Sequence, residues 1–179
     1  MYFRKGMLFF LLTLLLGFSS GCGKMLSEKE AIFQTKEASE EAFKHSDVKP
    51  NFNGQALSLY LPTSMEIKEQ TNNNMILTGG DNQTYILFFN LMENQTSRLN
   101  YKVASSKENN LLLESYRDDS RFSYVRVLPV NDSNEYELQV SVGGVKITTY
   151  AEKGELASDS EKMMDIVNSV QYSGSLVRE

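Results

Sequence analysis

Short apolar segments separated by clusters of Asn, Asp, Gly and Ser fill the chain from residue 55 to residue 150, and this pattern restricts the fold more than any other feature. Segments of this length between turn-forming residues are typical of β-strands. The clearest of them, 135–142, alternates polar and apolar residues, and the Gly143-Gly144 pair that follows fits a two-residue hairpin turn. We therefore expect strands over 56–61, 65–70, 75–78, 85–89, 111–116, 122–130, 135–142 and 145–150.

The segment 85–89 is apolar at every position, which predicts a central strand with both faces covered. After residue 150 the apolar residues follow helical spacing, which predicts a helix over 156–170 packed on the sheet. The stripe consists of Leu156, Ser160, Met163, Val167 and Val170. The segment 94–110 is ambiguous between a short helix and an edge strand, and we favour a partly helical structure. Together these segments predict an α+β fold, an antiparallel twisted sheet of about six strands with helices packed on its faces.

A further helix is predicted over 28–44, before the strands begin. Ser27 and Glu30 form a capping-box pattern, in which each side chain satisfies a free backbone N–H at the start of a helix. One face then carries Ile32, Thr35, Ser39 and Phe43. Two interpretations remain open: the helix packs on its own domain, or it is a tether that spaces the domain from an attachment point or docks a partner.

The start of the chain has the order of a secretory signal. The basic residues Arg4 and Lys5, an apolar run over 7–16 and the small residues 19–21 precede the single cysteine, Cys22. The apolar run is shorter than the roughly 20 residues that cross a bilayer. The segment before Cys22 resembles the lipobox of bacterial lipoproteins, which implies that the cysteine carries a diacylglyceryl group. The alternatives are an ordinary secretory signal that leaves a free thiol, and an anchor that stays uncleaved.

This interpretation divides the chain into a signal peptide over 1–21, a lipidated N-terminus with a helical tether over 22–50, and an α+β sandwich domain over 51–179. Removal of the signal peptide takes away two basic residues and changes the formal net charge from −5 to −7. An acidic exported protein is a poor candidate for nucleic-acid binding. We expect its contact with the membrane to come from the lipid anchor alone.

Three local sequences carry a second resemblance: LSLYLP at 57–62, VGGVK at 142–146 and IVNSV at 166–170. With the order of the expected helices and strands, they are similar to the PsbP/Mog1-like group of α/β/α sandwich domains, to which many small bacterial lipoproteins and DcrB-type envelope proteins belong. The similarity covers about residues 51–172. It implies a sandwich fold, but no catalytic residues and no cofactor, because members of the group have diverse roles.

The chain offers little for catalysis or metal binding of the common types. Any Ser-His-Asp or Cys-His arrangement would need the single histidine, His45, and zinc sites need several Cys or His ligands. The oxygen-rich segments 118–120 and 131–135 could ligate calcium, but they lie between expected strands, where the same residues are favoured in turns. We therefore predict no catalytic, cofactor-binding or metal-binding residue, and Cys22 is the one candidate site, for lipidation.

Aromatic residues could either line a ligand groove or pack in the core, and the alternation along the strands favours the core. They are Tyr60, Tyr85, Phe88, Phe89, Phe122, Tyr124, Tyr136 and Tyr150.

These features predict a lipoprotein anchored at the extracytoplasmic face of the cell membrane, which is not an enzyme and which binds or stabilises another envelope component. The alternative is a lipoprotein that binds a small molecule or a metal ion. The two differ in the surface that they require. A partner-binding protein should expose an apolar patch, whereas a ligand-binding protein should contain a concave pocket with converging polar groups.

Overall fold

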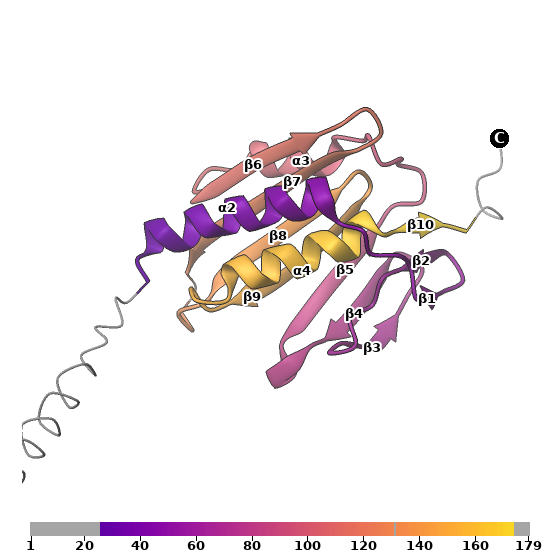
Figure 1. Ribbon diagram of the computed structural model, residues 1–179, viewed down its shortest axis with the longest axis horizontal. Helices are drawn as coiled ribbons and strands as arrows, with labels where there is room; N and C mark the ends of the chain where they lie inside the picture. Colours follow the sequence, from indigo (N-terminus) through magenta and orange to yellow (C-terminus); the bar gives the residue numbers. More distant parts are fainter. Residues whose placement is uncertain (1–25, 131, 174–179) are drawn as a thin grey trace, which may run out of the picture.

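The computed structural model describes residues 26–130 and 132–173, which form an α+β fold. The main sheet has seven antiparallel strands in the order β3-β4-β5-β9-β8-β7-β6 (Figure 1). In chain order these strands are β3 Glu66–Gln70, β4 Asn74–Thr78, β5 Thr84–Phe89, β6 Leu112–Arg117, β7 Phe122–Val130, β8 Tyr136–Val142 and β9 Val145–Ala151. Every one begins and ends within one residue of its predicted bounds, and the sheet has seven strands where about six were predicted.

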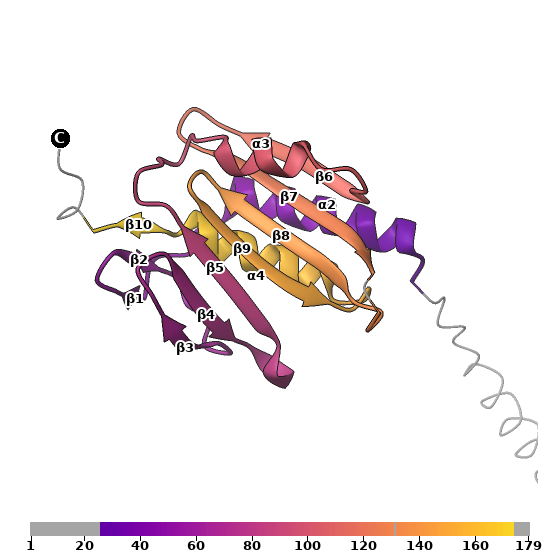
Figure 2. The same cartoon turned by 180° about the vertical axis from the view of Figure 1, so that it is seen from behind.

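Helices lie on both faces of this sheet, but unequally. Helices α2 (Glu28–His45) and α4 (Leu156–Asn168) lie side by side on one face (Figure 1). The short helix α3 (Leu99–Ser105) lies on the opposite face near β7, as Figure 2 shows, so the ambiguous segment 94–110 is partly helical. All five residues of the predicted stripe are buried, but α4 ends at Asn168, two residues before the predicted end, so Val170 lies beyond the helix. None of the helices in the described ranges is long and apolar enough to span a membrane.

Helix α2 packs on the domain and is part of its core. The Ser27 hydroxyl accepts a hydrogen bond from the Glu30 N–H, as the capping pattern predicted. The buried Thr35 hydroxyl donates to the Ala31 carbonyl, and the Ser160 hydroxyl of α4 donates to the Thr35 carbonyl at 3.2 Å. These small side chains let the two helices approach closely with their polar atoms satisfied. The segment 22–50, expected as a tether, therefore contains a helix that belongs to the folded unit.

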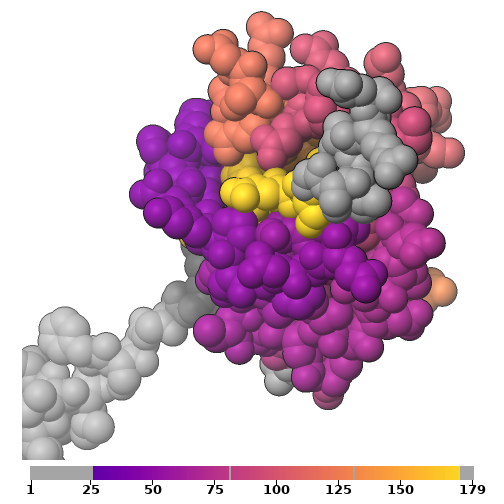
Figure 3. All heavy atoms as spheres, turned by 90° about the vertical axis from the view of Figure 1, so that its right-hand side faces the viewer, coloured from indigo at the N-terminus to yellow at the C-terminus, as the bar shows by residue number. Residues whose placement is uncertain are grey.

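A second, three-stranded sheet joins the segment after α2 to the C-terminal end of the described chain. Strand β2 (Leu57–Leu59) pairs with β1 (Phe52–Asn53) on one side and with β10 (Gln171–Tyr172) on the other. Figure 3 views this end of the molecule, where the yellow residues of β10 lie against the purple residues that follow α2. Strands β1 and β10 were not predicted, because a two-residue strand has no periodicity to detect.

The expectation that both faces of 85–89 are covered is wrong. Tyr85, Leu87 and Phe89 of β5 are buried on the face of the sheet that carries α2 and α4, but Ile86 on the other face is 50% exposed. Figure 2 shows that α3 lies near β7 and leaves β4, β5 and β9 without a covering helix among the described elements. An unbroken apolar run therefore marks a strand here, but it does not report how many layers cover that strand.

The turn between β8 and β9 positions α3. Gly143 has φ of +54°, a conformation that favours glycine, and a Cβ atom there would lie 2.2 Å from the Asn94 carbonyl oxygen. The Asn100 side chain of α3 donates to the Gly143 carbonyl at 3.1 Å. The predicted glycine turn thus serves two purposes: it closes the hairpin, and it lets the segment before α3 cross the hairpin closely.

Candidate functional site

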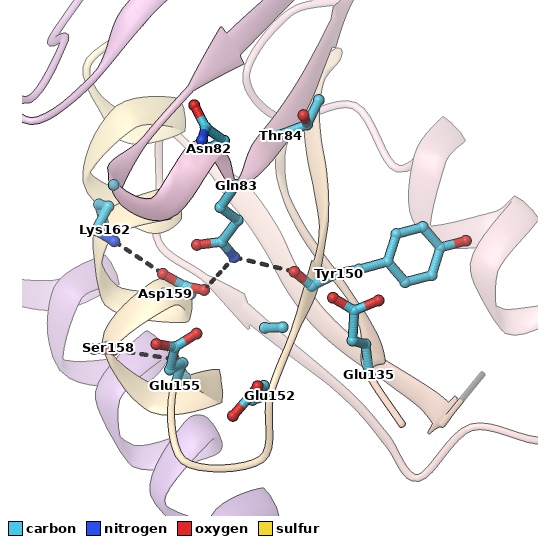
Figure 4. Close-up of a pocket in the computed structure, with 12 residues that line it drawn as sticks. Asn82, Gln83, Thr84, Glu135, Tyr150, Glu152, Glu155, Ser158, Asp159 and Lys162 are labelled. Atoms are coloured by element: carbon cyan, nitrogen blue, oxygen red, sulfur yellow. Dashed lines mark hydrogen bonds and ion pairs between the residues drawn. The ribbon is translucent and has the colours of Figure 1, made fainter. Parts of the chain in front are cut away.

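A polar pocket of about 630 Å³ lies where the start of α4 meets the start of β5 and the end of β9 (Figure 4). The 3₁₀ turn η2 (Gly80–Asn82) contributes a further wall. Most side chains around the pocket are polar or charged, and those labelled in Figure 4 are Asn82, Gln83, Thr84, Glu135, Tyr150, Glu152, Glu155, Ser158, Asp159 and Lys162.

Asp159 is the centre of the hydrogen-bond network in this pocket, and it is only 2% exposed. Its Oδ1 accepts hydrogen bonds from the Tyr85 hydroxyl and from Lys162 Nζ, both at 2.9 Å. Its Oδ2 accepts from Gln83 Nε2 at 2.7 Å. Each carboxylate oxygen therefore has a donor, which a buried charge requires in order to be tolerated.

Gln83 and Tyr85 connect this carboxylate to the sheet. Gln83 Nε2 also donates to the Tyr150 carbonyl at 3.1 Å, and Gln83 Oε1 lies 2.7 Å from the Tyr85 hydroxyl. The single hydroxyl proton of Tyr85 is shared between Gln83 Oε1 and the Asp159 carboxylate. Burial raises the pKa of Tyr85 well above its ordinary value, and the negative charge of Asp159 raises it further. Tyr85 therefore stays protonated and remains a donor.

The rim of the pocket is acidic. Glu135, Glu152 and Glu155 surround the opening, and Figure 4 shows them on the side of Asp159 away from Asn82. Lys162 is the one basic side chain in the lining, and it is paired with Asp159. The hydrogen bonds of the buried Asp159 carboxylate, together with those of Gln83, thus connect α4 to β5 and β9. The arrangement therefore presents a negatively charged surface around the pocket.

Asp159 is not among the residues of the predicted stripe, although the sequence carried a signal for its burial. Asp159 comes three residues after Leu156 and four before Met163, so helical geometry places it beside the stripe. Its distant partners, Gln83 and Tyr85, could not be inferred from that spacing.

The acidic segment 118–120, one of the two possible calcium ligand sets, forms a turn. Asp118 Oδ1 accepts hydrogen bonds from the Ser120 and Arg121 backbone N–H groups, at 2.8 and 2.7 Å, and Asp118 Oδ2 pairs with the Arg121 guanidinium at 2.6 Å. Arg121 also stacks over Phe43, with 4.5 Å between the guanidinium carbon and the ring centroid, and donates to the Phe43 carbonyl at the end of α2. The turn interpretation is confirmed, because local donors occupy the Asp118 carboxylate.

These contacts predict a pH dependence of stability. Burial by itself raises the pKa of Asp118, but the hydrogen bonds from Arg121 and Ser120 outweigh it and lower the pKa from 3.8 to about 2. Because the folded-state pKa is lowered, this stabilisation is fully present above pH 3.8 and is lost as the pH falls through about 2. Urea unfolding of wild type and Asp118→Asn should differ at pH 5 and converge towards pH 2. A difference that stays constant over this range would contradict the assignment.

The other sequence candidates lie apart from one another. Cys22 lies outside the described residues, as does position 131 of the second oxygen-rich segment, whereas Glu135 lies at the rim of the acidic pocket. His45 lies at the exposed end of α2, with its Nε2 3.8 Å from a Glu41 carboxylate oxygen. Within the described ranges, no group of three or more His, Cys, Asp or Glu side chains could hold a metal ion.

The aromatic set does not line a common groove. Five of its members are buried, namely Tyr85, Phe89, Phe122, Tyr124 and Tyr136. Tyr60 and Phe88 are half-buried, and Tyr150 is 49% exposed on the open face of the sheet. Core packing, the favoured interpretation, is confirmed for the five buried residues.

Comparisons with known proteins add little beyond these observations. No protein-family model and no curated protein matches the chain. Among solved structures, the chain is similar to the solution structure of cyanobacterial PsbP (CyanoP) from Synechocystis sp. PCC 6803, with 8% sequence identity and a TM-score of 0.37. The match covers 70% of this chain and 98% of that chain. A similarity of this size supports no functional inference, and the α+β class stated above rests on the helices and strands themselves.

Proposed function

We propose that the chain is a membrane-anchored extracytoplasmic lipoprotein, not an enzyme, whose domain binds or stabilises another envelope component. The observation that carries the proposal is the open face of the main sheet, defined here as the uncovered face of β4, β5 and β9 (Figure 2). The order of basic, apolar and small residues before Cys22 supports the anchor.

The open face presents two apolar side chains in register on neighbouring strands. Ile86 of β5 pairs with Ile76 of β4 on one side and with Thr148 of β9 on the other. Tyr150 follows two residues after Thr148 on the same face, and both Ile86 and Tyr150 are about half exposed. Exposed apolar side chains that lie together, rather than singly, are typical of protein interaction surfaces.

The short connection to Cys22 supports a domain held close to the bilayer. Residue 26 lies four residues after Cys22, and four residues span roughly 14 Å when fully extended. Because α2 is packed in the core, lipid on Cys22 would hold the start of that helix near the membrane. The two acyl chains of a diacylglyceryl group are sufficient for stable attachment.

Site-specific photo-cross-linking in living cells tests both parts of the proposal. A photoreactive amino acid replaces Ile86 on the open face, and in a matched variant it replaces Phe33, which is exposed on α2. We expect the Ile86 position to form one reproducible cross-link to an envelope protein and the Phe33 position to form none. Equal products from both positions, or none from either, would contradict the proposed binding face.

The same cells test the anchor when the photoreactive variant also carries Cys22→Ala. We expect loss of the processed, lipid-modified form by mass spectrometry, release from the membrane fraction or retention of an uncleaved precursor, and a weaker cross-link because local concentration is lost. A Cys22→Ala protein that is processed and membrane-bound like wild type would refute the anchor without affecting the interpretation of the open face.

A further inference from the structure

A cleft of about 740 Å³ lies at the far end of α3, between the segment 107–111 and strands β7 and β8. Leu111, Leu128 and Pro129 give it an apolar wall. The C-terminal end of this segment joins the sheet, because the Leu111 N–H donates to the Val127 carbonyl at 2.9 Å. The cleft shares no lining residue with the acidic pocket.

Arg126 is the exceptional residue in this cleft, because most of its side chain is buried while its charged end has no acidic partner among the described residues. It is 6% exposed, and its cross-strand neighbours are Leu113 on β6 and Gln139 on β8. Its Nε donates to Asn110 Oδ1 at 2.6 Å. Among the described residues no carboxylate lies within 4.0 Å of the guanidinium, and no protein acceptor bonds its Nη groups.

The geometry leaves the guanidinium ready for a ligand. A buried arginine normally satisfies its five N–H donors, because an unpaired charge removed from water is costly. Asn110 Oδ1 accepts the hydrogen bond from Arg126 Nε and so orients the guanidinium. Asn110 is itself held in place, because its Nδ2 donates to the Lys107 carbonyl at 3.0 Å. In the described ranges, Ser46 Oγ is the sole fully buried side-chain polar atom without a hydrogen-bond partner. The Nη groups of Arg126 also have no protein acceptor, so they are not fully buried. Because Arg126 lines the cleft, a ligand in the cleft can reach its free N–H donors.

We propose that this cleft binds the carboxylate of a small organic acid. The two Nη groups of Arg126 donate to the carboxylate oxygens, and the hydrocarbon part of the acid lies against Leu128 and its apolar neighbours. A planar guanidinium matches a carboxylate in this way, with two parallel hydrogen bonds. The inference does not depend on the proposed partner-binding function or on the lipid anchor.

The charges of the lining balance, which disfavours a dianion. Lys107 and Arg126 supply two positive charges, and Glu108 and Glu137 supply two negative ones. Glu137 accepts a hydrogen bond from Gln139 Nε2. A phosphate dianion would meet two carboxylates, whereas a monocarboxylate with an apolar tail uses the arginine and the apolar wall together.

Titration of the full-length protein with pentanoate tests the proposal, with pentanamide as the neutral analogue of the same shape and inorganic phosphate as a second anion. We expect pentanoate to bind with one-to-one stoichiometry by calorimetry and to shift the Arg126 Nε–Hε resonance. Pentanamide should bind at least about tenfold more weakly, as expected for the loss of charge-assisted hydrogen bonds. Arg126→Gln should lose at least about tenfold in pentanoate affinity, while Arg117→Gln, at an exposed arginine on β6, should stay within about twofold of wild type.

Equal binding of pentanoate and pentanamide, an unchanged affinity in Arg126→Gln, tighter binding of phosphate, or no binding of pentanoate at 10 mM would each overturn the proposal. If Arg126→Gln does not fold, as judged by circular dichroism, the comparison of pentanoate with pentanamide on wild type decides the question. The movement of the Arg126 resonance, with the Arg117 resonance as an internal reference, then locates the site.

Discussion

Val167→Asp is expected to unfold the domain under conditions in which the wild-type protein is folded. Val167 is 1% exposed on α4, in the same core cluster as Val125 and Leu138 of the sheet. An aspartate there would bury a charge without a partner, which costs at least about 4 kcal/mol and is a large share of the stability of a small domain. Urea unfolding followed by circular dichroism measures the change.

Two further variants separate the causes of this loss. Val167→Ala removes volume without adding a charge and should destabilise the domain less. Val167→Asn places a neutral side chain of the same size as aspartate at the same position and should destabilise the domain less than Val167→Asp, because it buries no charge. If Val167→Asp retained wild-type stability, the face of α4 that packs on the sheet would be assigned incorrectly.

Asp159→Ala is expected to cause the second-largest loss, about 3 kcal/mol of unfolding free energy. The substitution removes the acceptor of hydrogen bonds from Gln83, Tyr85 and Lys162, and it leaves the buried Tyr85 hydroxyl with one acceptor fewer. Because these bonds join α4 to β5 and β9, hydrogen exchange should also accelerate at the start of α4.

Lys162→Met provides the matched control for this network. The Lys162 side chain is about one-third exposed, so loss of its ion pair with Asp159 should cost no more than about 1 kcal/mol. A loss in Asp159→Ala no greater than that in Lys162→Met would show that the buried carboxylate does not hold α4 to the sheet.

The elements that could be predicted from the sequence are those with a strong local pattern. The alternation over 135–142, the glycine pair after it and the helical stripe from Leu156 to Val170 each predict the observed structure, because periodicity reports which side of an element is apolar. The capping pattern at Ser27 and Glu30 similarly marks the start of α2. The strands β1 and β10 were missed, because they exist only through pairing with β2, more than 100 residues away in the case of β10.

The candidate sites were less accessible to sequence reasoning. Asp159 and Arg126 are charged residues that local patterns assign to solvent, yet both are buried. Asp159 is tolerated because Gln83 and Tyr85, more than 70 residues earlier, donate to it. Arg126 is enclosed because α3 and the segment after it return over β7.

The sequence by itself determined the strands of the main sheet, the helices α2 and α4, the hairpin turn and the α+β class, because these follow from interactions within a few residues of the chain. Only the tertiary structure decided that α2 joins the core, that one face of β5 stays open and that two charged side chains are buried. Those outcomes depend on which distant segments lie against each face of an element. A pattern within one element shows which side is apolar, but it does not show what covers that side.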